Sequence, residues 1–178
     1  MFACLSLLFC RLTLLAVFCW ATVGKAQDVT AFREAVVDFH MLPSSWSRAL
    51  AWIFLGAECL VVVCLLSGIA PLLVAGFVLA AALLLAFGIA LSTTLLRKMH
   101  VVCNCFGRTV RYVSVYDVVR NGLLVLCALG GLWFLHLPLP PAPAVAFVVI
   151  GCMSLCTAIL LSNLADIVDM LRKPLLLQ

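Results

Sequence analysis

The run from Leu72 to Leu96 contains no charged residue, and it limits what this chain can fold into more than any other feature. A bilayer core about 30 Å thick takes about 20 apolar residues of helix, so a run of this length is long enough to cross it. The composition agrees, because 67% of the residues are hydrophobic and only 10% are charged. A soluble domain carries about 25% charged residues. The chain is therefore predicted to be an integral membrane protein.

Four further apolar runs approach the length of a membrane span. They cover Phe2–Val23 (interrupted by Arg11), Leu50–Leu66, Gly122–Leu137 and Ala144–Leu164. Residues 67–71 form a tight link, and the prolines of residues 138–143 cannot continue a helix. We therefore expect an all-α, polytopic transmembrane helix bundle, with residues 1–178 as a single membrane domain.

The first apolar run has two interpretations. Because small residues follow it at Val23-Gly24-Lys25-Ala26, it can be a signal peptide with a cleavage site. However, it lacks a basic start, since Arg11 is the only positive side chain before Lys25. We favour a retained span on that criterion. The chain also has no basic stripe with interleaved aromatic residues, so nucleic acid is not an expected partner.

The positive charges indicate an orientation. With five spans, the two long connections (residues 25–46 and 97–119) and the C-terminus share one side of the membrane. That side carries Lys25, Arg33, Arg48, Arg97, Lys98, Arg108, Arg111, Arg120, Arg172 and Lys173, and the other side has only Arg11, inside the first span. An excess of Lys and Arg marks cytoplasmic loops. This rule places both long connections in the cytoplasm, which conflicts with the function considered below.

The sharpest chemical signal is Cys103-Asn104-Cys105-Phe106-Gly107, shortly after the third apolar run. Two thiols one residue apart are positioned to form a strained, small-ring disulfide, and strained or exposed disulfides are the labile, catalytic ones. The neighbouring Arg97, Lys98, His100 and Arg108 favour the thiolate, which is the attacking form. We therefore predict a redox-active pair with a potential above that of structural bridges, which lie below about −300 mV.

Two other interpretations of the cysteine pair remain. It can be a permanently closed disulfide that pins the loop. It can also bind a metal ion together with His100, although the spacing is not that of a zinc site. We therefore expect no metal site.

The remaining candidate residues are polar groups beside or inside the apolar runs. Glu58 lies near the middle of the second run, where a carboxylate costs about 2.5–3.5 kcal/mol, so we expect it to face the bundle interior. There it can be a proton relay, a partner of Arg97 or Arg120, or a protonated acid hydrogen-bonded between helices. Arg120 and Asn121 immediately precede the fourth run, and we expect them to cap that helix and to hold the cysteine loop against the bundle.

Several of these residues, in order along the chain, resemble the methylamine-utilisation MauE family, whose members are related to DoxX-like four-helix membrane proteins. Trp20–Lys25 is similar to the end of that family's first helix, and residues 31–43 are similar to its connecting segment. Glu58, Arg97, the Cys-x-Cys-Phe-Gly motif and Val119-Arg120-Asn121 follow in the family's order. Asn104 stands where the family usually has Gly. The resemblance covers about residues 10–135.

The resemblance implies four core helices, and the apolar run at about residues 144–164 adds a fifth, C-terminal helix. The resemblance also implies help in the maturation of an exported protein, in a bacterial inner membrane, by thiol–disulfide exchange with a thioredoxin-like partner. Cys103 and Cys105 would then be the catalytic residues of a thiol–disulfide oxidoreductase, supported by Glu58, Arg97, Phe106, Gly107, Arg120 and Asn121. Two alternatives remain: a non-catalytic assembly or chaperone subunit with a structural cysteine pair, and a quinone-linked, DoxX-like electron carrier. No other cofactor is expected.

Overall fold

The computed structural model describes residues 2–27, 29–30, 44–97, 114–137, 144–164, 167–168 and 170. Within these residues the secondary structure is helical, with five long helices. They are α1 (Phe2–Gln27), α3 (Ser44–Ser67), α4 (Ala70–Leu96), α5 (Val115–Leu135) and α6 (Ala144–Ser162). Each is long and apolar enough to cross a membrane. The prediction of an all-α, polytopic membrane protein is therefore confirmed.

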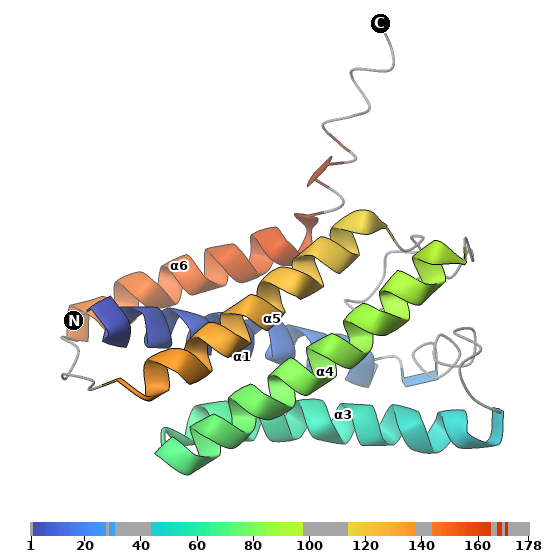
Figure 1. Ribbon diagram of the computed structural model, residues 1–178, viewed down its shortest axis with the longest axis horizontal. Coiled ribbons are helices and arrows are strands. Elements are labelled where there is room, and N and C mark those ends of the chain that lie inside the picture. Colours follow the sequence, from blue (N-terminus) through green and yellow to red (C-terminus); the bar gives the residue numbers. More distant parts are fainter. Residues whose placement is uncertain are drawn as a thin grey trace, which may run out of the picture.

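Four of the helices close into a ring. Helix α1 packs against α3 and α5, and α4 packs against the same two helices from the other side. Helix α6 packs against α1 on the outside of this ring. Successive helices run in opposite directions, so the end of α1, the start of α3, the end of α4 and the start of α5 lie at one end of the molecule (Figure 1). We call this the connection end. The predicted arrangement of four core helices plus a fifth is confirmed.

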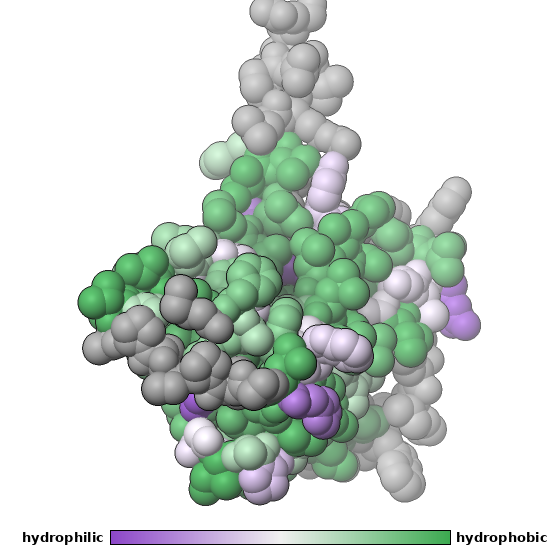
Figure 2. Space-filling model, turned by 60° about the vertical axis from the view of Figure 1, so that its left-hand side comes forward, coloured by the Kyte–Doolittle hydropathy of each residue, from purple (hydrophilic) through white to green (hydrophobic). Residues whose placement is uncertain are grey.

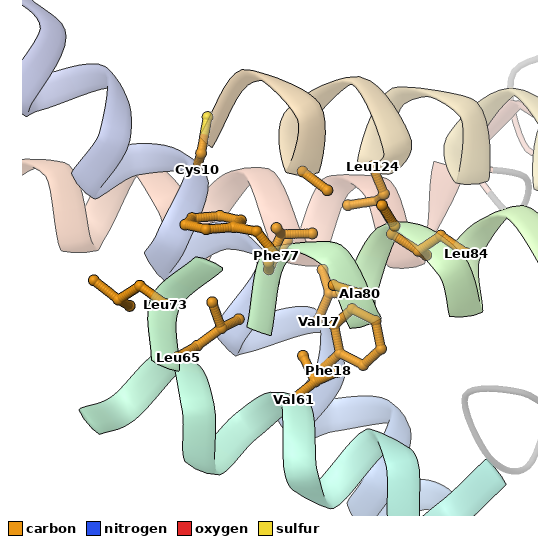
Figure 3. Close-up of a cluster of buried hydrophobic side chains, with 14 of the residues drawn as sticks. Cys10, Val17, Phe18, Val61, Leu65, Leu73, Phe77, Ala80, Leu84 and Leu124 are labelled. Carbon is orange, nitrogen blue, oxygen red and sulfur yellow. The ribbon is translucent and has the colours of Figure 1, made fainter. Parts of the chain in front are cut away.

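Phe77 of α4 is the centre of the apolar core. Its side chain is fully buried, and the side chains around it come from α1, α3, α4 and α5, among them Val17, Leu65 and Leu124 (Figure 3). Helix α5 approaches closely because it has a glycine at this level: a Cβ atom on Gly131 would lie 2.3 Å from the Phe77 ring. Burial of this interlocking cluster fixes how α4 and α5 cross.

The tight link predicted between the second and third spans is a turn with a cationic partner. Gly68 has a φ of 71°, a left-handed conformation that favours glycine. The last carbonyls of α3 accept hydrogen bonds from Arg11, whose Nε donates to Leu65 O (2.7 Å) and whose Nη2 donates to Leu66 O (3.2 Å). Carbonyls at a helix end have no partner within the helix. Arg11, which interrupts an apolar run in the sequence, therefore stabilises the end of α3.

Much of the outer surface is apolar, which a bilayer accommodates and water does not. Large side chains such as Ile53, Leu126 and Trp133 are each more than 60% exposed, and α6 presents Val145 and Val148 in the same way. On the face that Figure 2 shows, apolar residues cover most of the described surface, with few polar residues between them. Lipid is the environment that would cover such a surface.

Candidate functional site

The cysteine motif lies outside the described residues, as do Phe106 and Gly107, but both of its flanks are described. Arg97 is the exposed C-cap of α4, and its backbone N–H donates to Thr93 O (3.0 Å). Ser114 is the N-cap of α5. Because α4 and α5 pack side by side in opposite directions, both flanks of residues 98–113 lie at the connection end (Figure 1).

Helix α5 begins at a capping box. The backbone N–H of Tyr116 donates to Ser114 Oγ (3.2 Å), and the backbone N–H of Ser114 donates to Asp117 Oδ2 (2.9 Å). Such reciprocal bonds satisfy the backbone donors that a helix start leaves without a partner. The prediction that Arg120 and Asn121 cap this helix is therefore wrong. It placed the helix start at the first apolar residue, whereas the capping box lies in the polar segment before it.

Arg120 and Asn121 are instead buried in the second turn of α5. Arg120 Nη1 lies 3.7 Å from Asp117 Oδ1, and both residues are buried. Asn121 Nδ2 donates a hydrogen bond to the carbonyl oxygen of Leu84, in the middle of α4. A Cβ atom on Gly88 would lie 3.0 Å from Asn121 Nδ2, so a glycine on α4 leaves room for this amide. The two residues thus join α5 to its own first turn and to α4.

Glu58 of α3 points into the bundle, as predicted, and its cationic neighbour is Lys25 of α1. Lys25 Nζ donates a hydrogen bond to Glu58 Oε1, and the two residues are 3% and 5% exposed. Lys25 Nζ also lies 5.1 Å from the centroid of the Phe87 ring, within the range of a cation–π contact. From the sequence, Arg97 or Arg120 was considered as a cationic partner of Glu58, and not Lys25. Lys25 was missed because its apolar run was expected to end at Val23, whereas α1 continues to Gln27.

A small cavity of about 50 Å³ lies beside this ion pair, and all four core helices line it. The polar lining consists of Lys25, Glu58, Arg120 and Asn121, and we call these four residues the polar cluster. Apolar residues complete the walls, including Phe18 of α1 and Phe87 of α4. With Asp117 next to Arg120, two formal positive charges face two formal negative charges, so the buried group is balanced.

The metal-binding interpretation has no support from the described residues. Among the residues that the structure describes, no three His, Cys, Asp or Glu side chains lie close enough to hold a metal ion. The alternative set of His100, Cys103 and Cys105 lies outside those residues.

The family described as "Methylamine utilisation protein MauE" matches residues 3–134. This chain belongs to the MauE family. The match covers the four core helices almost completely and leaves α6 outside it.

A curated MauE relative gives the same result. The methylamine utilization protein MauE of Paracoccus denitrificans is 36% identical to this chain over 122 residues, which are 67% of this chain. The aligned part is 64% of the relative, so the chain matches less than two thirds of that protein's length. No solved structure matches this MauE family member.

Proposed function

We propose that this protein is a bacterial inner-membrane component of methylamine utilisation that helps an exported protein to mature by thiol–disulfide exchange at Cys103 and Cys105. Membership of the MauE family and the name of the Paracoccus relative support the metabolic context. The chemistry rests on the Cys-x-Cys motif, because a disulfide between cysteines one residue apart would be strained and the Lys and Arg residues near it in the sequence would favour the thiolate.

The observation that best supports this proposal is where the motif is anchored. Residues 98–113 connect the end of α4 to the start of α5, and these two helices pack against each other. The returning helix starts at a capping box, and one turn later it carries Arg120 and Asn121 into the bundle. Asn121 thus ties the start of α5, one attachment point of the cysteine segment, to the middle of α4. A site carried by packed helices is positioned more precisely than one carried by loops alone.

The exchange itself needs only sulfur chemistry. A thiolate of the client attacks the Cys103–Cys105 disulfide, forming a mixed disulfide and releasing the second cysteine as a thiolate. A second client thiolate then attacks the mixed disulfide, so the client gains a disulfide and the protein is left with both cysteines reduced. A disulfide on a thioredoxin-like partner reoxidises the pair by the same two steps in reverse.

Single replacements of the two cysteines test this proposal. In Cys103→Ser or Cys105→Ser, the remaining thiolate can still attack the disulfide of the thioredoxin-like partner, but this protein has no second cysteine to resolve the product. That mixed disulfide should therefore accumulate and be visible on non-reducing gels. The double variant should trap no partner and should lose client maturation. Cys59→Ser is the matched control, because Cys59 is an exposed cysteine inside a membrane span, and it should behave like the wild type.

The outcome also separates the alternative functions. If neither single variant traps a partner and the double variant still supports maturation, thiol exchange is excluded, and the protein is an assembly or chaperone subunit with a structural cysteine pair. A quinone-linked electron carrier remains a further hypothesis. It predicts that the redox state of the pair follows the quinone pool in membranes without any client.

A further inference from the structure

One oxygen of Glu58 has no hydrogen-bond partner within the described part of the chain. Oε1 accepts from Lys25, whereas Oε2 is buried and has no partner among the residues that the structure describes. Glu58 is only 5% exposed. Leaving a buried acceptor without a hydrogen bond costs about 1–3 kcal/mol, and more for a charged group. Native structures avoid this cost, often by binding an internal water molecule.

The space beside Glu58 has the properties that a bound water needs. The cavity has a volume of about 50 Å³, and about 10–15 Å³ is enough for one water molecule. A buried water also needs about two to four polar partners. Glu58, Lys25, Arg120 and Asn121 all line the cavity and come from three different helices. Comparable space between purely apolar walls would stay dry.

We propose that this cavity binds water at Glu58 Oε2 and that the hydrated carboxylate takes up and releases a proton inside the bundle. A hydronium ion in the cavity transfers its proton to Oε2, which leaves a neutral carboxylic acid and a water molecule, and the reverse step returns the proton. Within the described residues, the charged groups that line the cavity with Glu58 are Lys25 on α1 and Arg120 on α5, and Arg120 also lies next to Asp117. Helix α4 contributes apolar lining residues such as Leu91 and Phe87.

The position of the site suits exchange with the aqueous phase. Lys25 is two residues from the end of α1, and Arg120 is in the second turn of α5, so these two residues extend the polar lining from Glu58, near the middle of α3, toward the connection end. The inference stands on the contacts of Glu58 and not on the proposed thiol exchange, so the two can fail separately.

Hydroxyl-radical footprinting of the purified full-length protein in lipid nanodiscs tests the water. Radicals form from bound water as well as from bulk water, so buried residues beside an internal water are oxidised faster than dry ones. Phe18 and Leu91 line the cavity and are 4% and 1% exposed. Phe77 and Leu65 are matched controls, because both are fully buried and neither lines it. Phe18 should be oxidised several times faster than Phe77, and Leu91 faster than Leu65.

Two variants show whether Glu58 holds the water. The double variant Lys25→Met with Glu58→Leu removes the carboxylate without leaving a lone charge. The variant Ala21→Leu keeps both charges and fills the cavity from α1, because Ala21 lines the cavity. Both should bring the Phe18 rate down to that of Phe77. If Phe18 is no faster than Phe77 in the wild type, or if its rate survives in both variants, the water site is excluded.

Infrared difference spectroscopy tests the proton. Acidifying the wild type should produce the carbonyl band of a protonated carboxylic acid, and this band should move in deuterium oxide. The other carboxyl groups of the chain also contribute to this band, so one component of it should be missing in Glu58→Gln, a change that keeps the size of the side chain. If the wild-type and Glu58→Gln difference spectra are the same, the cavity is hydrated but Glu58 exchanges no proton, and that part of the inference is overturned.

Discussion

At the residue scale, Lys25 and Glu58 tolerate the bundle interior because each neutralises the other. A charged side chain in the middle of a membrane helix is expensive and normally faces a partner within the bundle. Here the ammonium group belongs to α1 and the carboxylate to α3. The Phe87 ring lies next to the ammonium group as well. The pair therefore connects α1, α3 and α4 at one point.

Removing one member of this pair should be much worse than removing both. Breaking a buried ion pair by removing one partner costs about 3–5 kcal/mol, because the other charge stays buried. We expect Lys25→Met to lower the thermal unfolding temperature strongly in detergent. The double variant Lys25→Met with Glu58→Met should recover much of the loss. A single variant as stable as the wild type would show that the pair is not formed in the protein.

At the scale of helices, glycines decide how closely α5 packs against α4. Gly131 is buried where the Phe77 ring meets α5, whereas nothing lies within 4 Å of a Cβ atom placed on Gly122 of the same helix. The two glycines thus have different roles within one element. The first makes room for a core ring, and the second is free of packing constraints among the described residues.

These two positions give a matched test of the core. Gly131→Ala puts a methyl group into the Phe77 ring, and overpacking of this kind costs about 1–3 kcal/mol. Gly122→Ala should leave stability unchanged or raise it slightly, since alanine is the better helix former by about 1 kcal/mol. Thermal unfolding of both variants in the same detergent measures the difference. Equal stability of the two would contradict the packing of Phe77 against α5.

The sequence predicted the helices well and their polar ends less well. Hydropathy located all five spans, because long apolar runs in lipid have no alternative to helix. It missed the start of α5, since Ser114 and Asp117 cap the helix about two turns before the apolar residues begin. The cost of a carboxylate inside a membrane span predicted that Glu58 faces inward. The sequence did not indicate that Lys25 is its partner, because this contact joins residues 33 positions apart through the packing of α1 on α3.

At the scale of the whole molecule, the alternating helices gather the polar chemistry at the connection end. Lys25 and Arg120 of the polar cluster lie toward that end, and residues 98–113 connect the end of α4 to the start of α5 there. Most of the Lys and Arg residues also belong to that side by sequence. The positive-inside rule therefore places the cysteine motif in the cytoplasm, whereas maturation of an exported protein requires it on the opposite side of the membrane.

The side of the membrane on which Cys103 and Cys105 react tests the central claim most directly. The measurement is labelling of intact spheroplasts with a membrane-impermeant maleimide after mild reduction, with the double variant Cys103→Ser and Cys105→Ser as the control for background. The proposed function predicts strong labelling of the wild type in intact spheroplasts and a large loss of signal in the double variant. Labelling of these two cysteines only after the membrane is permeabilised would place the motif in the cytoplasm and contradict thiol exchange with an exported protein.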